Sequence, residues 1–477
     1  MSGSSVAGGS LTALAAEVGR DLERLDYFSP GWVRSRDGVF DVVIVGGGQS
    51  GLGAAFGLLR ERVRNILVVD ENPAGFEGPW DTYARMITLR TPKHLTGIDL
   101  GVGALTCRAW WEAQYGSAAW GALDKIPRGA WMAYLRWFRE VLGIPVRNDA
   151  MVRLIEPQEG AVHRLTLEGG ETLLARKVVL ATGIQGGGEW HTPDFIRNNL
   201  PADRWAHTSQ AIDFDALRGR RVGILGGGAS AFDNAQHALN AGVAQVHVHI
   251  RRPALPTVNP IRFMEAAGFL RHYANLDDAA KYQVTHAFLT LNQPPTNDTF
   301  ERAAAFPGFE LHAASPWLDV RHGADGVVVT TPRGEIAYDF LILSTGMKTD
   351  ASLRPELAAV AGDIALWRDR YRPPPELANP LIDEHPYLGP GFELQANTPE
   401  GADRLRGLFA FNYSALVSLG LSAAALSGMK FALPRLVSAV TGQLFLDESK
   451  ALLEDFFRYD QPEFIGRWPR PQGPRRA

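Results

Sequence analysis

Two glycine-rich segments, about 180 residues apart, constrain the fold of this 477-residue chain more than any other feature. An apolar run at 41–45 leads into the first and one at 221–225 into the second, and a helical stretch follows each loop. Further apolar runs come next, at 66–69 and 246–250. Uninterrupted apolar runs are typical of parallel strands buried on both faces. Each segment therefore predicts a strand–helix–strand unit of the dinucleotide-binding type, and the chain has two of them.

The second unit is predicted to be inserted into the first. Two similar strands, 178–183 and 340–346, each end in a Thr-Gly turn and lie on either side of the second unit. We therefore expect an α/β protein with two Rossmann-like domains, one of them discontinuous. The predicted segments are a helical extension (1–35), the first part of the discontinuous domain (36–203), the inserted domain (204–335), the second part of the discontinuous domain (336–457) and a tail (458–477).

The first loop, with Gly46, Gly48 and Gly51, has the spacing that cradles a pyrophosphate. The first glycine makes the turn, the second admits the phosphates, and the third lets the helix pack on the strand. Asp70 lies 19 residues after Gly51, and Glu71 follows it. A carboxylate at this point can hold ribose hydroxyls, which suits FAD, although the residues do not decide between the two acids. The alternative is a turn that serves packing alone.

The second loop has the form G-x-G-x-x-A, with Gly226, Gly228 and Ala231, and its second strand ends in Arg251 and Arg252. An arginine can clamp the 2′-phosphate that a carboxylate would repel, so this unit favours NADPH over NADH. The alternative is that both arginines are solvated charges at a strand end.

Composition excludes several other classes of protein. The 48 basic and 52 acidic residues give a formal charge of −4, too balanced for a nucleic-acid or membrane-surface protein. We find neither a signal peptide nor a membrane span and expect a cytoplasmic protein. The single cysteine, Cys107, rules out an intrachain disulfide and is expected to be packed in the core. The histidines show no compact ligand spacing, so no metal site is predicted, and His247 and His249 are expected to pack on a strand face.

Beyond the loops, the sequence resembles the flavin-containing monooxygenase and Baeyer–Villiger-like (class B) family of two-dinucleotide-domain flavoproteins over about residues 38–445. The resemblance is carried by the segments GFEGPW (75–80), RMITLRTPK (85–93), FAFN (409–412) and GLS (420–422), together with the two Thr-Gly turns. The family's linker pattern Phe-x-Gly-x-x-x-His is not kept. Only His207 is in place, with Pro201 and Asp203 at the other positions and Ala211 where Baeyer–Villiger members have tryptophan.

The resemblance implies that NADPH reduces FAD and that one oxygen atom of O2 enters a small organic substrate by way of a C4a-(hydro)peroxyflavin. It places Arg90 and His207 near the flavin, with no certain catalytic residue. The cofactor-binding residues that it implies are Gly46, Gly48, Gln49, Ser50, Gly51, Asp70, Glu71, Trp80, Arg90, Thr91, Thr182, Gly183, Gly226, Gly228, Ala229, Ser230, Ala231, Arg251, Arg252, Thr345, Gly346, Asn412, Leu421 and Ser422.

Runs at 255–260 and 291–295 are similar to those of a bacterial subgroup in which some relatives are named FAD-dependent urate hydroxylases. A nitrogen heterocycle such as urate is therefore a candidate substrate. Two other functions stay open, because a fold does not fix a function. One is a reductase that passes electrons to a separate acceptor, and the other is a non-catalytic nucleotide-binding protein. The oligomeric state is also left open.

Overall fold

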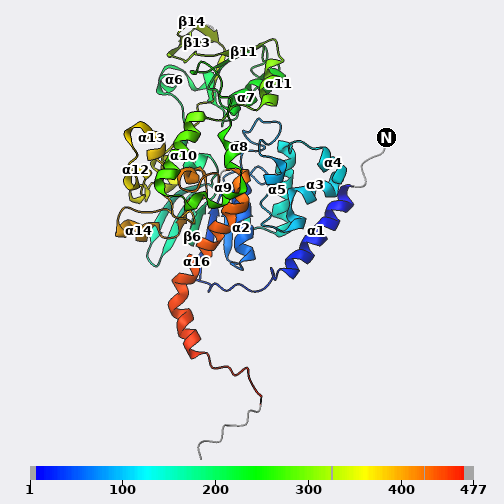
Figure 1. Ribbon diagram of the computed structural model, residues 1–477, viewed down its shortest axis with the longest axis vertical. Coiled ribbons are helices and arrows are strands. Elements are labelled where there is room, and N and C mark those ends of the chain that lie inside the picture. The colour runs from blue at the N-terminus through cyan, green and yellow to red at the C-terminus, as the bar shows by residue number, and fades with distance from the viewer. Residues whose placement is uncertain (1–6, 324–325, 424, 467–477) are drawn as a thin grey trace, which may run out of the picture.

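Two parallel sheets, one behind each glycine-rich loop, organise the computed structural model, which describes residues 7–323, 326–423 and 425–466 (Figure 1). The first sheet has the strand order β3-β2-β1-β6-β5-β4, with β17 also paired to β6. Its parallel strands are β1 (Phe40–Val45), β2 (Ile66–Val69), β3 (Val146–Arg147), β6 (Thr172–Leu180) and β17 (Leu408–Phe409), and β4 (Val152–Gln158) and β5 (Val162–Leu167) continue it as an antiparallel extension.

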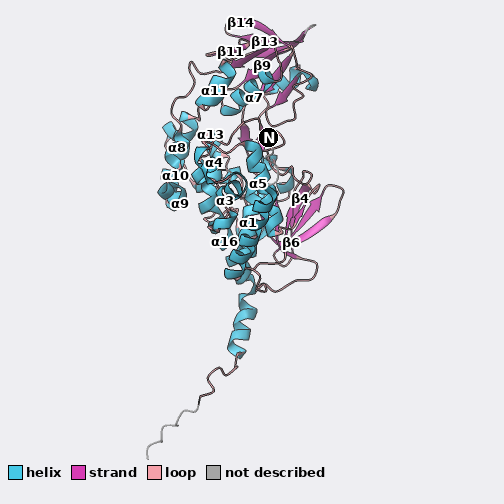
Figure 2. Cartoon of the chain, turned by 90° about the vertical axis from the view of Figure 1, so that its right-hand side faces the viewer, coloured by secondary structure: helices cyan, strands magenta, loops and turns pink. Residues whose placement is uncertain are grey.

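The second sheet is parallel throughout and has the order β11-β10-β9-β15-β8. Its strands are β8 (Trp205–His207), β9 (Arg221–Leu225), β10 (Gln245–His249), β11 (Phe309–His312) and β15 (Phe340–Leu343). Two small antiparallel sheets complete the strands: β12 (Asp319–Gly323), β13 (Gly326–Thr331) and β14 (Gly334–Tyr338) form one, and β7 (Gly188–Trp190) pairs with β16 (Met347–Thr349). In Figure 2 the strands of the two large sheets lie apart, with helices between them.

The topology confirms the inserted domain but moves one of its boundaries. The first sheet takes strands from both sides of the segment that builds the second sheet. We predicted the return to the first domain at 336, whereas Leu341 and Ile342 of β15 pair with Gly223 and Ile224 of β9. Strand β15 therefore belongs to the second sheet, and the return comes after Leu343. An apolar run predicts a buried strand but does not indicate to which sheet the strand belongs, and the boundary was therefore predicted too early in the chain.

Helices cover the sheets and fill the space between them. They are α1 (Ala7–Arg24), α2 (Gln49–Arg60), α3 (Cys107–Tyr115), α4 (Ser117–Ala122), α5 (Arg128–Leu142), α6 (Asp194–Asn199), α7 (Ala229–Asn240), α8 (Pro260–Met264), α9 (Ala267–His272), α10 (Asp278–Leu291), α11 (Asn297–Ala304), α12 (Trp367–Arg370), α13 (Pro380–Asp383), α14 (Pro399–Leu405), α15 (Leu416–Leu419) and α16 (Leu426–Arg458).

The main core lies around the first sheet and includes the N-terminal extension. Helix α1 turns Leu14, Val18 and Leu22 inward, as its amphipathic pattern predicts. Trp131 and Tyr134 of α5 are fully buried there, with ring centres 5.0 Å apart, so these aromatic side chains pack in the core. Cys107 is buried too. None of the helices in the described residues is long and apolar enough to cross a membrane.

Helices α8 and α10 belong to the inserted segment by sequence but pack on the first domain. Tyr282 of α10 shares an apolar cluster with Trp367 and Val417, and Met264 of α8 shares one with Leu416 and Leu421. This packing closes one side of the space between the two sheets.

The last helix among the described residues is the long α16, whose final turns project from the body (Figures 1 and 2). A buried ion pair fastens the helix to the first sheet: Glu448 Oε1 accepts from the fully buried Arg176 at 2.7 Å. Part of the predicted extension (1–6) and most of the predicted tail (467–477) lie outside the described residues.

Candidate active site

A cavity of about 950 Å³ lies between the two glycine loops. Ligands of parallel α/β sheets bind beyond the carboxyl ends of the strands, where these loops are. Its walls come from the first loop, the ends of β2 and β6, the segment after β2, helices α7, α8 and α10, and residues 412–427. It is large enough for a bound dinucleotide end and a second small molecule.

The first loop has the geometry that a bound pyrophosphate needs. Gly46 has φ +107°, and a Cβ there would lie 2.5 Å from the Ala181 carbonyl oxygen, so only glycine fits. Gly48 precedes α2, and no side chain caps the helix at that residue. The free backbone N–H groups of this helix start carry partial positive charge and can receive an anion.

Asp70 fixes this loop from the end of β2. Its Oδ2 accepts from the Gly47 amide at 2.6 Å, and its Oδ1 accepts from the Asn72 amide at 2.8 Å. Burial raises the pKa of the Asp70 carboxyl. Glu71 is exposed and accepts from Gln185 Nε2 at 3.0 Å. Both acids line the cavity, so both remain in reach of a ribose there.

Two polar atoms on the cavity-lining residues fit a bound polar ligand. Trp80 Nε1 and Asn234 Oδ1 are buried and have no hydrogen-bond partner among the described residues. A buried polar atom without a partner costs about 1–3 kcal/mol, which a ligand that supplies the missing hydrogen bond would recover. These two residues come from opposite domains and face the same cavity.

The second loop repeats the geometry of the first. Gly226 has φ +127°, and a Cβ there would lie 2.2 Å from the Ser344 carbonyl oxygen. Helix α7 begins after Gly228, again with no side-chain cap, and nothing lies within 4 Å of the Cβ position of Gly228. This loop is therefore also open to a phosphate group. Arg251 is exposed after the end of β10, and Arg252 Nη2 donates to the Thr290 carbonyl at 3.1 Å.

The segment after β2 links the two domains across the cavity. Arg85 donates from Nη1 to the Thr208 carbonyl at 2.9 Å, and burial with nearby Arg128 lowers its pKa to about 10, so it stays cationic at neutral pH. Arg90 forms an ion pair with Asp233 of α7. Burial raises the pKa of Asp233, while the Arg90 charge lowers it. Arg262 Nη2 donates to the Arg90 carbonyl at 3.1 Å.

His207 lies outside the cavity lining, at the end of β8. Its ring contacts Trp190, with centroids 5.1 Å apart, and its Nδ1 lies 2.8 Å from Ser209 Oγ. Burial lowers the pKa of His207 to about 4, so the ring is neutral at physiological pH. Among the candidates near the flavin, Arg90 lines the cavity and His207 supports its wall through Trp190 and Ser209.

The structure brings most of the predicted residues together. Those that line the cavity are Gly46, Gly48, Gln49, Ser50, Asp70, Glu71, Trp80, Arg90, Thr91, Thr182, Gly183, Ser230, Asn412, Leu421 and Ser422. Those that do not are Gly51, His207, Gly226, Gly228, Ala229, Ala231, Arg251, Arg252, Thr345 and Gly346. Gly51 is a buried residue in the first turn of α2. Of the second loop, only Ser230 lines the cavity.

Several polar residues of the cavity were not found from the sequence. Asp233 and Asn234 follow Ser230 by three and four residues on α7, so they share the helix face that meets the cavity. Buried polar residues at this spacing after a glycine loop are the signal that could have identified them. Glu265 also lines the cavity and pairs with Arg262 at 2.8 Å. Arg262 belongs to the run at 259–264, which the sequence indicated as the lining of a substrate mouth between the domains, and Arg262 does line the cavity.

Comparisons with known proteins place this geometry in context. A family described as FAD-NAD(P)-binding matches residues 43–185, and one described as L-lysine 6-monooxygenase/L-ornithine 5-monooxygenase matches residues 122–298. The chain is 61% identical to the FAD-dependent urate hydroxylase of Xanthomonas campestris pv. campestris over 467 residues, which cover 97% of this chain and 99% of that protein.

Solved structures agree in fold at low sequence identity. The ornithine hydroxylase of Pseudomonas aeruginosa superposes with a TM-score of 0.68 at 18% identity, over 85% of this chain and 100% of that one. The L-lysine 6-monooxygenase of Pseudomonas syringae superposes with a TM-score of 0.64 at 17% identity, over 85% of this chain and 99% of that one. The two-domain fold predicted from the sequence is thereby confirmed.

Proposed function

We propose that this chain, which belongs to the FAD-dependent urate hydroxylase family of flavin monooxygenases, hydroxylates urate at the expense of NADPH and O2. The class of enzyme, a flavin-dependent monooxygenase, follows from the family. The substrate is our proposal. The observation that carries it is the cavity lined by the first glycine loop and by Ser230 of the second, whose wall also holds arginine and amide side chains.

FAD fits the first loop and the inner part of the cavity. Gly46, Gly48 and the start of α2 would hold its pyrophosphate, and Asp70 or Glu71 its ribose. Thr182, Gly183, Asn412, Leu421 and Ser422 line the cavity beyond these residues and would surround the rest of the cofactor. When bound, FAD supplies the electron transfer from NADPH and the reaction with O2.

NADPH fits the second loop. Gly226, Gly228 and the start of α7 would hold its pyrophosphate, while Ser230 places this helix at the cavity. Arg251 and Arg252 follow β10, where the 2′-phosphate of NADPH would lie, and a guanidinium can bind that phosphate through two hydrogen bonds. The exposed position of Arg251 leaves its guanidinium free to do so.

Urate is a flat heterocycle that is anionic at neutral pH and carries alternating N–H and C=O groups. Arginine and amide side chains match such an edge because they offer paired donors, and the amides add acceptors. The cavity wall provides two guanidinium groups, Arg90 paired with Asp233 and Arg262 paired with Glu265, and the amide side chains of Asn259, Asn292 and Gln293. These groups would orient the heterocycle toward the flavin. The single buried cysteine and the use of NADPH fit an enzyme of the reducing cytoplasm.

The test is NADPH and O2 consumption by the FAD-loaded protein with urate, xanthine, ornithine or lysine. Of the four compounds, we expect only urate to accelerate the consumption of NADPH and of O2. The loss of its ultraviolet absorbance should show that one urate is consumed for each NADPH. Acceleration by ornithine or lysine and not by urate would overturn the proposed substrate. NADPH oxidation that needs no O2 and requires a separate acceptor would instead identify a reductase.

A further inference from the structure

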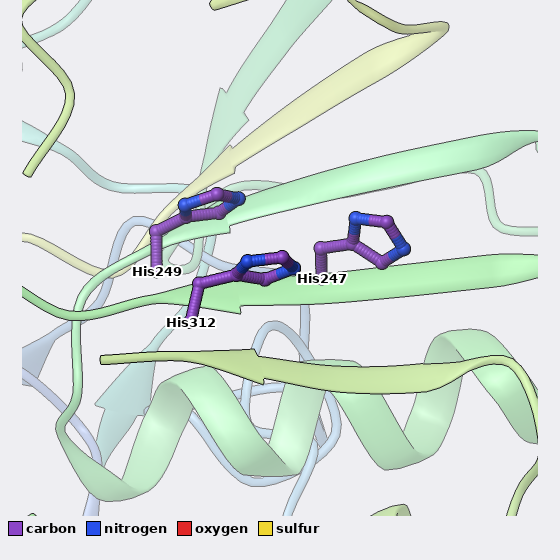
Figure 3. Close-up of side chains that lie close together, drawn as sticks. All are labelled: His247, His249 and His312. Atoms are coloured by element: carbon purple, nitrogen blue, oxygen red, sulfur yellow. The ribbon is translucent and has the colours of Figure 1, made fainter. Parts of the chain in front are cut away.

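A cluster of three histidines and one glutamate lies on the second sheet, away from the proposed active site. His247 and His249 alternate on β10, and in the register of the edge strand β11 they face Glu310 and His312. Side chains two residues apart on a strand share a face, so all four lie on one side of the sheet. Figure 3 shows the three rings side by side, and one ring nitrogen from each lies within 4.8 Å of the others. We call these four residues the histidine cluster.

The distances around Glu310 suit a single metal ion. Its Oε2 lies 3.1 Å from His312 Nε2 and 3.9 Å from His247 Nε2. A zinc ion binds histidine nitrogen and carboxylate oxygen at about 2.0–2.2 Å, so two ligand atoms on one tetrahedral ion are about 3.4 Å apart. The observed separations bracket this value. The ligand nitrogens of His247 and His312 lie within 4.8 Å of each other, so rotations of both rings and of the exposed Glu310 side chain would bring all three atoms to one ion.

His249 and Tyr338 are placed to support the ligands. The His249 and His312 rings are stacked, with centroids 4.6 Å apart and an interplanar angle of 7°. An imidazole binds a metal in the plane of its ring, so two stacked rings do not share one ion. His249 is held by Ser315 Oγ at 2.9 Å and by Tyr338 Oη at 2.7 Å. The Tyr338 hydroxyl also lies 3.1 Å from His247 Nδ1, which leaves His247 Nε2 for the ion. Partners of this kind fix the orientation of metal-binding histidines.

We propose that His247, Glu310 and His312 bind one divalent transition-metal ion of the zinc type, with His249 and Tyr338 as supporting residues. Imidazole and carboxylate are ligands that zinc accepts, and three protein ligands leave its fourth position to water. Spacing along the chain does not reveal the site, because the third histidine comes from the neighbouring strand.

A bound ion would tie the edge strand β11 to β10. Strand β10 also contacts the second loop, since the Gly226 amide donates to the His249 carbonyl at 3.0 Å. An ion that binds only the folded protein stabilises it by mass action. We therefore expect zinc to raise the unfolding temperature of the protein, whatever the identity of the enzyme's substrate.

The experiment is a titration of the FAD-loaded full chain, without a histidine tag, with ZnCl2 in competition with a chromophoric zinc chelator. We expect one equivalent to bind, and expect E310Q and H312Q to weaken the affinity at least tenfold. E310Q removes a ligand whose side chain is 59% exposed, so the fold is preserved. H322Q is the matched control, because His322 is exposed on β12 of the same domain and stands outside the cluster.

Substitution with Co2+ gives a second readout. We expect visible absorption bands of a four-coordinate site in the wild type and in H322Q, and their loss in E310Q and H312Q. Absence of stoichiometric binding to the wild type would overturn the proposal. Equal affinity in the wild type, E310Q and H312Q would also overturn it, because the ion would then be bound elsewhere.

Discussion

The Arg90–Asp233 ion pair across the cavity gives the sharpest mutational prediction. The Asp233 side chain is 4% exposed, whereas that of Arg90 is 25% exposed. In R90Q the buried carboxylate loses its partner, and breaking a buried pair in this way costs about 3 kcal/mol of unfolding free energy. In D233N the remaining group is an arginine that still reaches water, so we expect a loss of about 1 kcal/mol.

The two variants should also differ in their dependence on pH. Burial raises the pKa of Asp233 in the folded protein, and loss of Arg90 raises it further. A raised carboxyl pKa gives stability that is present at low pH and is lost as the pH rises through the folded value. The penalty of R90Q should therefore shrink when the pH is lowered from 8 to 5, whereas that of D233N should not shrink, because the raised pKa of Asp233 stabilises the wild type at low pH and Asn cannot titrate.

Urea unfolding of the FAD-loaded proteins measures both effects, and a double variant gives the coupling of the pair. We expect R90Q/D233N to lose little more than D233N alone. R153Q is the control, because the Arg153–Glu168 pair is exposed on both sides and should cost less than about 0.5 kcal/mol. An equal or larger loss in D233N than in R90Q would refute this reasoning, as would a penalty for R90Q that does not change with pH.

Three further predictions concern the loops and the wall of the cavity. G51A should abolish FAD retention and cost about 3 kcal/mol of stability, because its Cβ would lie 1.8 Å from the Gly46 carbonyl oxygen. The control G442A, on the open surface of α16, should stabilise the protein by up to about 1 kcal/mol. Flavin absorbance and urea unfolding measure both effects. R251A/R252A should raise KM for NADPH about 10- to 100-fold and leave KM for NADH unchanged, and an equal rise for both nucleotides would refute the assignment of the 2′-phosphate. Burial lowers the pKa of His207 to about 4, so its neutral ring favours the folded state above pH 6.5 and loses this effect as the pH falls toward 4. The unfolding free energy of the wild type relative to H207Q should therefore drop by about 2 kcal/mol between pH 7 and pH 5. Urea unfolding at the two pH values measures this drop, and a constant difference would contradict it.

Local patterns predicted the parallel strands closely. The apolar run at 66–69 is β2 (Ile66–Val69), and the run at 221–225 is β9 (Arg221–Leu225). The glycine spacing predicted the turn at Gly46, because a tight strand-to-helix turn requires positive φ there. These features depend on residues that are neighbours in the sequence, which explains why the sequence alone sufficed.

Contacts between distant segments could not be predicted in this way. The pairing of β15 with β9, the Arg90–Asp233 ion pair and the histidine cluster each join residues that are more than 50 positions apart. These residues are brought together only by the fold, within the second sheet or across the two domains. Those contacts depend on the charge and burial of the residues in the folded protein, and periodicity along the chain does not indicate which distant residues will pair.

The central claim is that the enzyme inserts one oxygen atom from O2 into urate at the expense of NADPH. The most direct measurement is a turnover of the FAD-loaded protein with NADPH and urate under isotopically heavy oxygen gas, with mass spectrometry of the product. We expect one heavy oxygen atom per product molecule and one NADPH consumed for each. A product that takes its oxygen from water, or NADPH oxidation that yields only hydrogen peroxide, would contradict it.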